Sequence, residues 1–261
     1  MEINLKNKTA WVFGGSRGIG RSIALELARA GANIVLIARN KIQLQTVKEE
    51  LSEDAGQKHD VLSVDVSRRD VLIKTLKSYA GLNPADILIN NSGGPPPGQA
   101  HTAELEEYSD AFNQHVLAAQ SIMKIALPEM KRNRFGRIIN IISTSVKQPI
   151  DGLGVSNTIR GAIANWGKTV ASELGGFGIT VNNVLPGATK TDRLLDLIQK
   201  NAEKTGSETE SVVKKMQHSI PVGRFADPAE IAYLVVFLSS DFAAYINGVN
   251  IPVDGGRTKS L

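Results

Sequence analysis

The sequence predicts an α/β protein in which a single doubly wound domain, residues 1–261, holds a parallel sheet of seven strands. Short apolar runs alternate along the chain with stretches whose apolar residues recur every three or four positions. No linker or internal repeat divides the 261 residues, and a hydrophobic content of 42% is that of a globular domain with a sizeable core. Such alternation is typical of a parallel sheet covered by helices on both faces.

The predicted strands are short and rich in apolar residues. In chain order they cover residues 9–14, 33–38, 61–66, 86–90, 137–143, 179–185 and 248–253. Helices are expected between them, and the clearest apolar stripe runs from Val155 to Leu174. The segment 189–226 interrupts this order because it is long, polar and rich in Lys and Glu. We interpret it as a helical flap inserted in the domain and as a lid for the substrate.

Composition narrows the range of functions. The chain has no cysteine and four scattered histidines, so neither a disulfide framework nor a metal site is expected. The longest apolar run, 231–238, is far shorter than the roughly 20 residues that cross a bilayer, and residues 1–10 lack a signal-peptide core. We expect a cytoplasmic protein without a membrane partner. The basic cluster at 131–134 falls at a predicted helix end, where cations complement the dipole, so no nucleic-acid partner is expected.

A glycine-rich loop, GGSRGIG at residues 14–20, follows the first strand and opens the first helix. Gly14 permits a tight turn, Gly18 lets the backbone approach a diphosphate, and Gly20 lets the helix pack closely on the strand. The position of the pattern at the first strand–helix junction favours a dinucleotide site. The alternative is a tight turn with no ligand.

The end of the second strand indicates which dinucleotide is bound. An NAD enzyme commonly has an acid there to hold the ribose 2′-hydroxyl, whereas this chain has Arg39 and no acid. Arg17 in the glycine loop adds a second guanidinium group, and such groups suit a 2′-phosphate. We therefore favour NADP over NAD, with two ordinary surface cations as the alternative.

Together with further motifs, this loop resembles that of the short-chain dehydrogenase/reductase family, including its 3-oxoacyl-carrier-protein reductase-like members. The matching segments are the glycine loop, the DV pair at 65–66, NNSG at 90–93 where the family has NNAG, the strand end carrying Ser143, NNVLPG at 182–187 with Thr191, and DGG at 254–256. The resemblance covers essentially the whole chain. It implies a Rossmann-like fold, hydride transfer between a nicotinamide and a small carbonyl or alcohol, and a homo-oligomer, either a tetramer or a dimer.

The resemblance also implies which residues hold the cofactor. These are Gly14, Ser16, Arg17, Gly18, Ile19, Gly20, Arg39, Asp65, Val66, Asn91, Gly93, Arg160, Pro186, Gly187 and Thr191.

The catalytic motif departs from the family pattern. The family has a Tyr 13 residues after its active-site Ser and a Lys four residues later, and this chain has Ser156 and Arg160 at those positions. A serine hydroxyl is far less acidic than a phenol of pKa about 10, and an arginine does not shuttle protons. His115 stands where the family has an Asn.

Two interpretations follow. In the first, the protein reduces a carbonyl group that Ser143 orients, and His115, expected to titrate near neutral pH, is the best candidate acid. The expected substrate contacts are Gly94, Pro95, Ser145, Lys147 and Gln148. In the second, hydride chemistry is lost and the protein is a dinucleotide sensor or a non-hydride isomerase or dehydratase. His115 as a purely structural residue also remains open.

Overall fold

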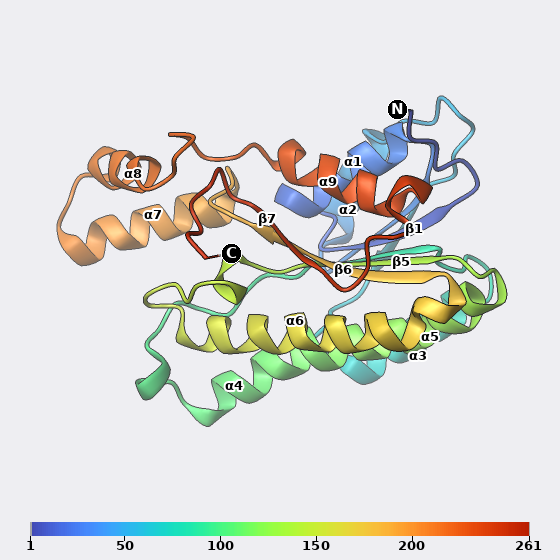
Figure 1. Ribbon diagram of the computed structural model, residues 1–261, viewed down its shortest axis with the longest axis horizontal. Coiled ribbons are helices and arrows are strands. Elements are labelled where there is room, and N and C mark those ends of the chain that lie inside the picture. The colour runs from blue at the N-terminus through green and yellow to red at the C-terminus, as the bar shows by residue number, and fades with distance from the viewer. Residues whose placement is uncertain (1, 261) are drawn as a thin grey trace.

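The computed structural model describes residues 2–260 and contains the predicted sheet (Figure 1). All strand pairs are parallel, in the order β3-β2-β1-β4-β5-β6-β7. The strands are β1 (Thr9–Phe13), β2 (Asn33–Ala38), β3 (Asp60–Ser63), β4 (Ile87–Asn90), β5 (Gly136–Ile141), β6 (Ile179–Pro186) and β7 (Asn250–Val253). The predicted fold class is confirmed. The third strand ends earlier than predicted, because Asp65 accepts hydrogen bonds from the backbone and hydroxyl of Ser67 and turns the chain.

Helices cover both faces of the sheet (Figure 1). One face carries α1 (Gly18–Arg29), α2 (Lys41–Glu49) and α9 (Pro228–Ser239). The other carries α3 (Arg69–Ala80), α5 (Ala118–Arg132) and α6 (Gly154–Leu174), with α4 (Leu105–Phe112) packed outside α6. Because both faces are covered, a central strand such as β5 is buried along its whole length.

The chain order places a crevice at the centre of the sheet. From β1 the sequence first builds β2 and β3 on one side and then crosses to β4 on the other. Loops leaving β1 and β4 therefore diverge at their carboxyl ends, and ligands of open parallel sheets bind at this point. The glycine loop follows β1, and the NNSG segment follows β4.

A row of asparagine side chains connects four neighbouring strands below this crevice. Asn90, Asn140, Asn183 and Asn250 are paired in register on β4, β5, β6 and β7. Their side-chain amides form a chain of hydrogen bonds of 2.8, 2.7 and 2.8 Å. Side-chain networks of this kind hold buried groups in one arrangement, and the row ends at the side-chain oxygen of Asn90, which is buried without a partner among residues 2–260. The row therefore helps to fix the register of the strands that carry the site.

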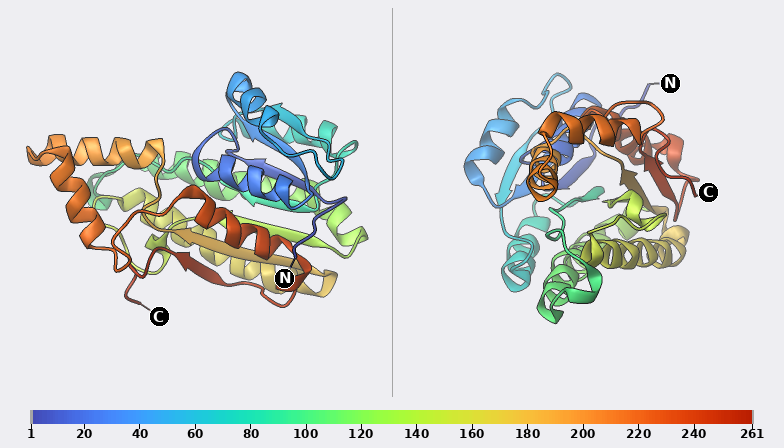
Figure 2. Two further views of the ribbon diagram at one scale, coloured as in Figure 1. Left: turned by 90° about the horizontal axis from the view of Figure 1, so that it is seen from above. Right: turned by 90° about the vertical axis from the view of Figure 1, so that its left-hand side faces the viewer.

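The segment between β6 and α9 forms the expected helical flap. It contains α7 (Asp192–Thr205) and α8 (Thr209–His218), which project beyond the sheet in two views (Figures 1 and 2). Apolar side chains on both helices build a small separate core that includes Leu194, Ile198 and Val212. Among the helices of residues 2–260, none combines the length and apolar character needed to cross a membrane.

Candidate active site

The glycine loop has a backbone that only glycine can supply. Gly14 and Gly18 have φ of +64° and +55°, in the left-handed region. A Cβ on Gly20 would lie 2.2 Å from the carbonyl oxygen of Gly14, so a side chain there would push α1 away from the loop. Asn91, after β4, donates from its amide to the carbonyl oxygens of Phe13 and Gly14 at 3.3 and 3.4 Å. The loop is therefore held against the end of β4.

The start of α1 fits the diphosphate of a dinucleotide. Its N-cap, Arg17, makes no side-chain capping bond, and no acid lies in the first turn. The first backbone N–H groups of a helix favour an anion. Arg17 lies 3.6 Å from Asp192 of the flap, with both side chains exposed, so this ion pair is weak in water.

The other predicted cofactor residues lie around the same crevice. Thr191 packs so close to the glycine loop that a Cβ on Gly18 would lie 3.2 Å from its methyl group. Its hydroxyl caps α7 by accepting from the N–H of Leu194. The exposed Arg39 acts on the carboxyl of Asp65: burial raises the pKa of that group, but hydrogen bonds from Ser67 and the charges of Arg39 and Arg68 lower it overall. Ile19 lies in the first turn of α1, and Pro186 is the last residue of β6. The remaining predicted residues lie in the loops at the strand ends, and these are Ser16, Val66, Gly93 and Gly187.

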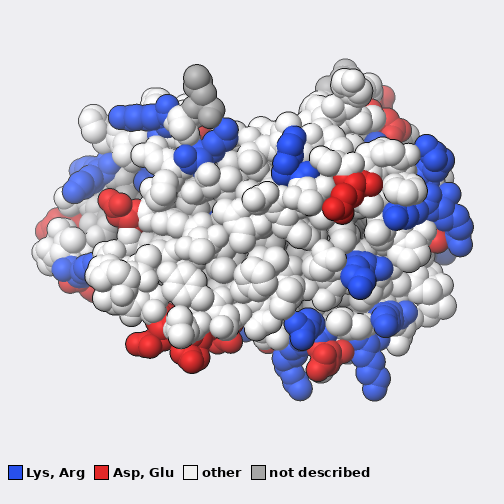
Figure 3. Space-filling view, turned by 60° about the horizontal axis from the view of Figure 1, so that its bottom comes forward, with Lys and Arg blue, Asp and Glu red and all other residues white. Residues whose placement is uncertain are grey.

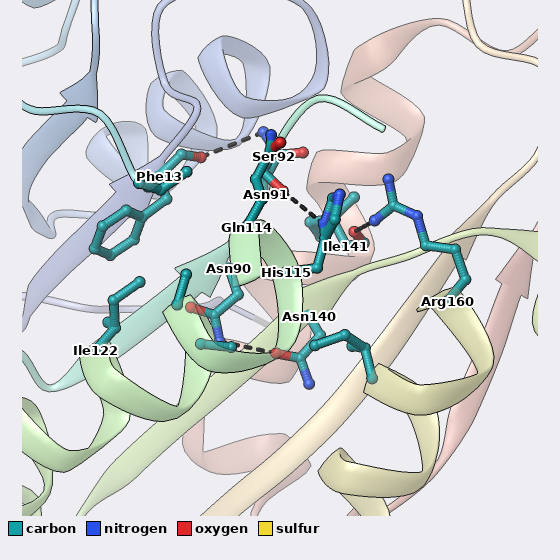
Figure 4. Close-up of a pocket in the computed structure, with 14 residues that line it drawn as sticks. Phe13, Asn90, Asn91, Ser92, Gln114, His115, Ile122, Asn140, Ile141 and Arg160 are labelled. Atoms are coloured by element: carbon teal, nitrogen blue, oxygen red, sulfur yellow. Dashed lines mark hydrogen bonds between the residues drawn. The ribbon is translucent and has the colours of Figure 1, made fainter. Parts of the chain in front are cut away.

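Ser143 lies just beyond the end of β5. Its hydroxyl accepts from the N–H of Ser145 at 3.1 Å and starts a short turn of 3₁₀ helix, Thr144–Val146. Ser156 and Arg160 lie one turn apart on α6, and both are buried. Nη1 of Arg160 donates to the carbonyl oxygen of Ile141 at 3.4 Å (Figure 4). The predicted one-turn spacing therefore brings the Ser156 and Arg160 positions to the side of β5.

His115 lies in a segment of π-helix, Asn113–Leu117, between α4 and α5. Single π-helical turns of this kind frequently occur at functional sites. Its Nδ1 is 2.9 Å from the hydroxyl of Ser92, and its buried Nε2 has no hydrogen-bond partner among residues 2–260. The ring lines a cavity that Asn90, Asn91 and Arg160 also line (Figure 4). Ser92 stands where the family motif has Ala, and His115 stands where the family has Asn. Two residues that differ from the family pattern are therefore in contact here.

The charge state of His115 differs from the prediction. Burial and the positive charges of Arg160 and Arg193 lower the pKa of His115 to about 3. The expectation that it titrates near neutral pH is therefore wrong, because charging a buried ring beside two guanidinium groups is unfavourable. The side chain is a neutral imidazole at pH 7 and has no imidazolium proton to donate.

This pKa shift predicts acid-sensitive stability. The unfolded chain protonates His115 at about pH 6.5, so it binds more protons than the folded protein between pH 6.5 and 3. The resulting free energy of stabilisation is complete above pH 6.5 and falls by about 2 kcal/mol at pH 5. In His115→Asn this loss is absent, so the destabilisation of the variant relative to wild type should be smaller at pH 5 than at pH 8 in urea unfolding. An equal difference at both pH values would contradict the shift, and His101→Asn, at an exposed position, is the matched control.

The predicted substrate residues occupy two sides of the cleft. The carbonyl oxygens of Gly94 and Pro95 accept from Nη1 and Nη2 of Arg193 at 3.1 and 3.2 Å. On the opposite side, the hydroxyl of Ser145 is buried without a partner in residues 2–260, and Gln148 is exposed. The backbone N–H of Lys147 donates to Thr144.

Sequence reasoning missed Arg193 and Ser92. Ser92 could have been found from its difference from the NNAG motif. Arg193 carries no local signal, because its partners lie 99 and 98 residues away.

Comparison with known proteins decides the family. The model of a protein family described as enoyl-(acyl carrier protein) reductase matches residues 14–258. The chain belongs to the short-chain dehydrogenase/reductase family. It is 32% identical over 265 residues to the NADPH-dependent reductase BacG of Bacillus subtilis (strain 168), covering 98% of this chain and 100% of the relative. It is 30% identical over 259 residues to the 3-oxoacyl-acyl-carrier-protein reductase FabG of Aquifex aeolicus (strain VF5), covering 98% and 99%.

Solved structures agree with this assignment. L-sorbose reductase from Gluconobacter frateurii, in complex with NADPH and L-sorbose, superposes with a TM-score of 0.93 at 30% identity over 100% of both chains. The expected resemblance is thus confirmed, and the protein is an NAD(P)-dependent oxidoreductase of the short-chain type.

Proposed function

We propose that this protein is an NADP-dependent reductase of a small carbonyl compound that uses a serine–arginine pair where the family uses tyrosine and lysine. The observation that supports the proposal is that Ser143 lies just beyond the end of β5, while Ser156 and Arg160 lie one turn apart on α6 and Arg160 donates to the carbonyl oxygen of Ile141 in β5. The cradle for a dinucleotide is intact, and polar groups surround the place where a carbonyl would lie next to it.

The cofactor is NADP, as in the similar proteins whose names specify NADPH. The glycine loop and the open start of α1 would hold the diphosphate. Arg17 and Arg39, both exposed at the crevice, would hold the 2′-phosphate, and Arg17 would exchange its weak contact with Asp192 for it. Asp65 and Val66 would border the adenine, while Asn91, Gly93, Pro186, Gly187 and Thr191 would border the nicotinamide half.

Each catalytic residue has a separate role in the proposal. When bound, the reduced cofactor would supply the hydride for the carbonyl carbon. Ser143 donates a hydrogen bond that orients the carbonyl oxygen, and the guanidinium group of Arg160 stabilises the negative charge that grows there. Ser156 passes one proton to this oxygen and regains one from water. Neutral His115, tied to Ser92, is a positioning residue that packs beside Arg160.

The experiment is an assay of NADPH oxidation over a panel of aldehydes, ketones and oxo acids, with NADH run in parallel. We expect turnover with NADPH and a loss of at least about 100-fold in kcat/KM in Ser143→Ala, the usual cost of removing one donor to a developing oxyanion. Ser78→Ala, on the exposed side of α3, is the matched control and should retain activity. Tight NADPH binding without turnover on any carbonyl would contradict the proposal and support the sensor interpretation.

We also propose that the flap is the substrate lid and that the protein is cytoplasmic.

We further propose that the protein is a homo-oligomer, a tetramer or a dimer. Figure 3 shows a broad area without charged side chains on the side of the molecule where α4, α5 and α6 lie. Leu105 and Phe112 of α4 are exposed large apolar residues, and exposed apolar patches are typical of interfaces. Sedimentation of the intact chain tests this prediction, and a monomer at micromolar concentration would contradict it.

A further inference from the structure

Two guanidinium groups from distant parts of the chain meet at the substrate side of the cleft. Arg160 lies on α6, and Arg193 lies in the first turn of α7 in the flap. A Cβ on Gly94 would lie 2.9 Å from Nη2 of Arg193 and 3.0 Å from Nη2 of Arg160. Both groups therefore converge on one glycine of the loop that follows β4.

Neither group is neutralised by the protein. Within residues 2–260, no carboxylate lies within 4.0 Å of the guanidinium nitrogens of Arg160 or Arg193. Asp196, one turn along α7, acts on Arg193 only from a distance, and Asp192 faces Arg17. Burial and the charge of Arg193 lower the pKa of Arg160 to about 10, which leaves it protonated at pH 7.

Neighbouring groups do not change this balance. His115 is neutral, and the hydrogen bonds of both arginines go to backbone carbonyl oxygens. Arg193 is exposed at the mouth, but Arg160 is buried, and a buried charge is ordinarily paired, since an uncompensated ion in a low dielectric is costly. The cleft thus carries two positive charges and lacks their counter-ion.

The shape of Arg193 indicates the kind of anion. Its two terminal nitrogens each donate to a separate carbonyl oxygen, those of Gly94 and Pro95, so two backbone acceptors now occupy both prongs of the guanidinium group. A carboxylate matches this fork with two parallel hydrogen bonds. Arg193 lies on the flap at the exposed mouth of the cleft. Its side chain can therefore turn from these carbonyl oxygens toward a ligand without disturbing the core.

We propose that Arg193, with Arg160 behind it, binds a carboxylate group of the substrate, so that the compound reduced is an oxo acid. The inference rests on the proposed reductase function and names its substrate class. The carbonyl oxygen would face Ser143 and Arg160, and the carboxylate would face Arg193 at the mouth. Arg193 is a specificity residue in this arrangement.

The experiment compares acids with their neutral esters. The substrates are 2-, 4- and 5-oxohexanoate and the methyl ester of each, assayed with NADPH in wild type, Arg193→Gln, Arg193→Lys and the control Lys200→Gln. Lys200 is an exposed cation on the same helix, so this control removes the same charge away from the cleft. We expect at least one acid to exceed its ester by about 30-fold or more in kcat/KM.

Arg193→Gln should reduce the acid-to-ester ratio by at least about 10-fold, mainly through the KM of the acid, and Arg193→Lys should restore part of it. Lys200→Gln should leave the ratio unchanged. A purely structural latch between Arg193 and the Gly94–Pro95 loop would instead lower acid and ester turnover equally. That result, or equal use of acids and esters by wild type, would overturn the inference while leaving the reductase function intact.

Calorimetric binding of hexanoate and of inorganic phosphate to the protein with NADPH provides a readout without turnover. Hexanoate binding that weakens at least about 10-fold in Arg193→Gln supports the carboxylate site. If this is seen while no compound of the panel is reduced, only the reductase proposal fails. Binding of phosphate but not of hexanoate would overturn the assignment of a carboxylate. Absence of binding for both anions, with acids and esters reduced alike, would overturn it as well.

Discussion

Replacement of Gly20 by Ala should weaken NADPH binding by about 100-fold or more. The added Cβ would lie 2.2 Å from the carbonyl oxygen of Gly14 and 2.7 Å from the side-chain nitrogen of Asn91. Neither atom can retreat easily, because one is backbone and the other holds the loop to the end of β4. The start of α1 must therefore move away from the diphosphate position. A displacement of about 1 Å is enough to cost on the order of 100-fold in such sites, and we expect at least that loss of affinity in a fluorescence titration.

Gly161→Ala is the matched control for this prediction. Gly161 lies inside α6, and a Cβ there meets no atom within 4 Å. NADPH affinity should be unchanged, and the protein should gain up to about 1 kcal/mol in the free energy of unfolding, as Ala is the better helix former. Circular dichroism must show that Gly20→Ala still folds. A folded Gly20→Ala protein with wild-type affinity would show that the glycine loop is not the diphosphate site.

The double substitution Ser156→Tyr with Arg160→Lys should raise carbonyl reductase activity. The one-turn spacing on α6 is retained, so the two new side chains would occupy the family's catalytic geometry. A phenol with a pKa near 10 donates a proton far more readily than a serine hydroxyl, and a neighbouring ammonium group lowers that pKa further. Good general acids contribute about 100-fold or more to such reactions, and we expect a gain of at least about 10-fold in kcat/KM over the carbonyl panel.

The single variants separate the two contributions. Ser156→Tyr alone places a phenol beside Arg160, whose guanidinium group is buried and positively charged. Arg160→Lys alone keeps a cation but adds no acid. Neither should reach the activity of the double variant, because the two groups act as a unit. A double variant that loses turnover present in wild type would show that the serine–arginine pair is an effective catalytic arrangement in its own right.

The sequence by itself determined the sheet, the glycine loop and the location of most site residues. These features are local: strands buried on both faces read as short apolar runs, and a helix that starts against a tight turn requires Gly14, Gly18 and Gly20 at fixed positions. The one-turn relation of Ser156 to Arg160 likewise follows from helix geometry. The end of β3 was less predictable, because the Asx turn at Asp65 competes with the strand.

Only the tertiary structure decided the electrostatics of the cleft. The charge on His115 depends on its burial and on Arg160 and Arg193, which lie 45 and 78 positions further along the chain. Arg193 reaches Gly94 only because the flap folds back over the loop after β4. Solvation and Coulomb energies depend on distances in space, which no periodicity or motif spacing encodes. The sequence therefore predicted the segments that border the central crevice, whereas only the folded chain brought the guanidinium groups of Arg160 and Arg193 together at Gly94.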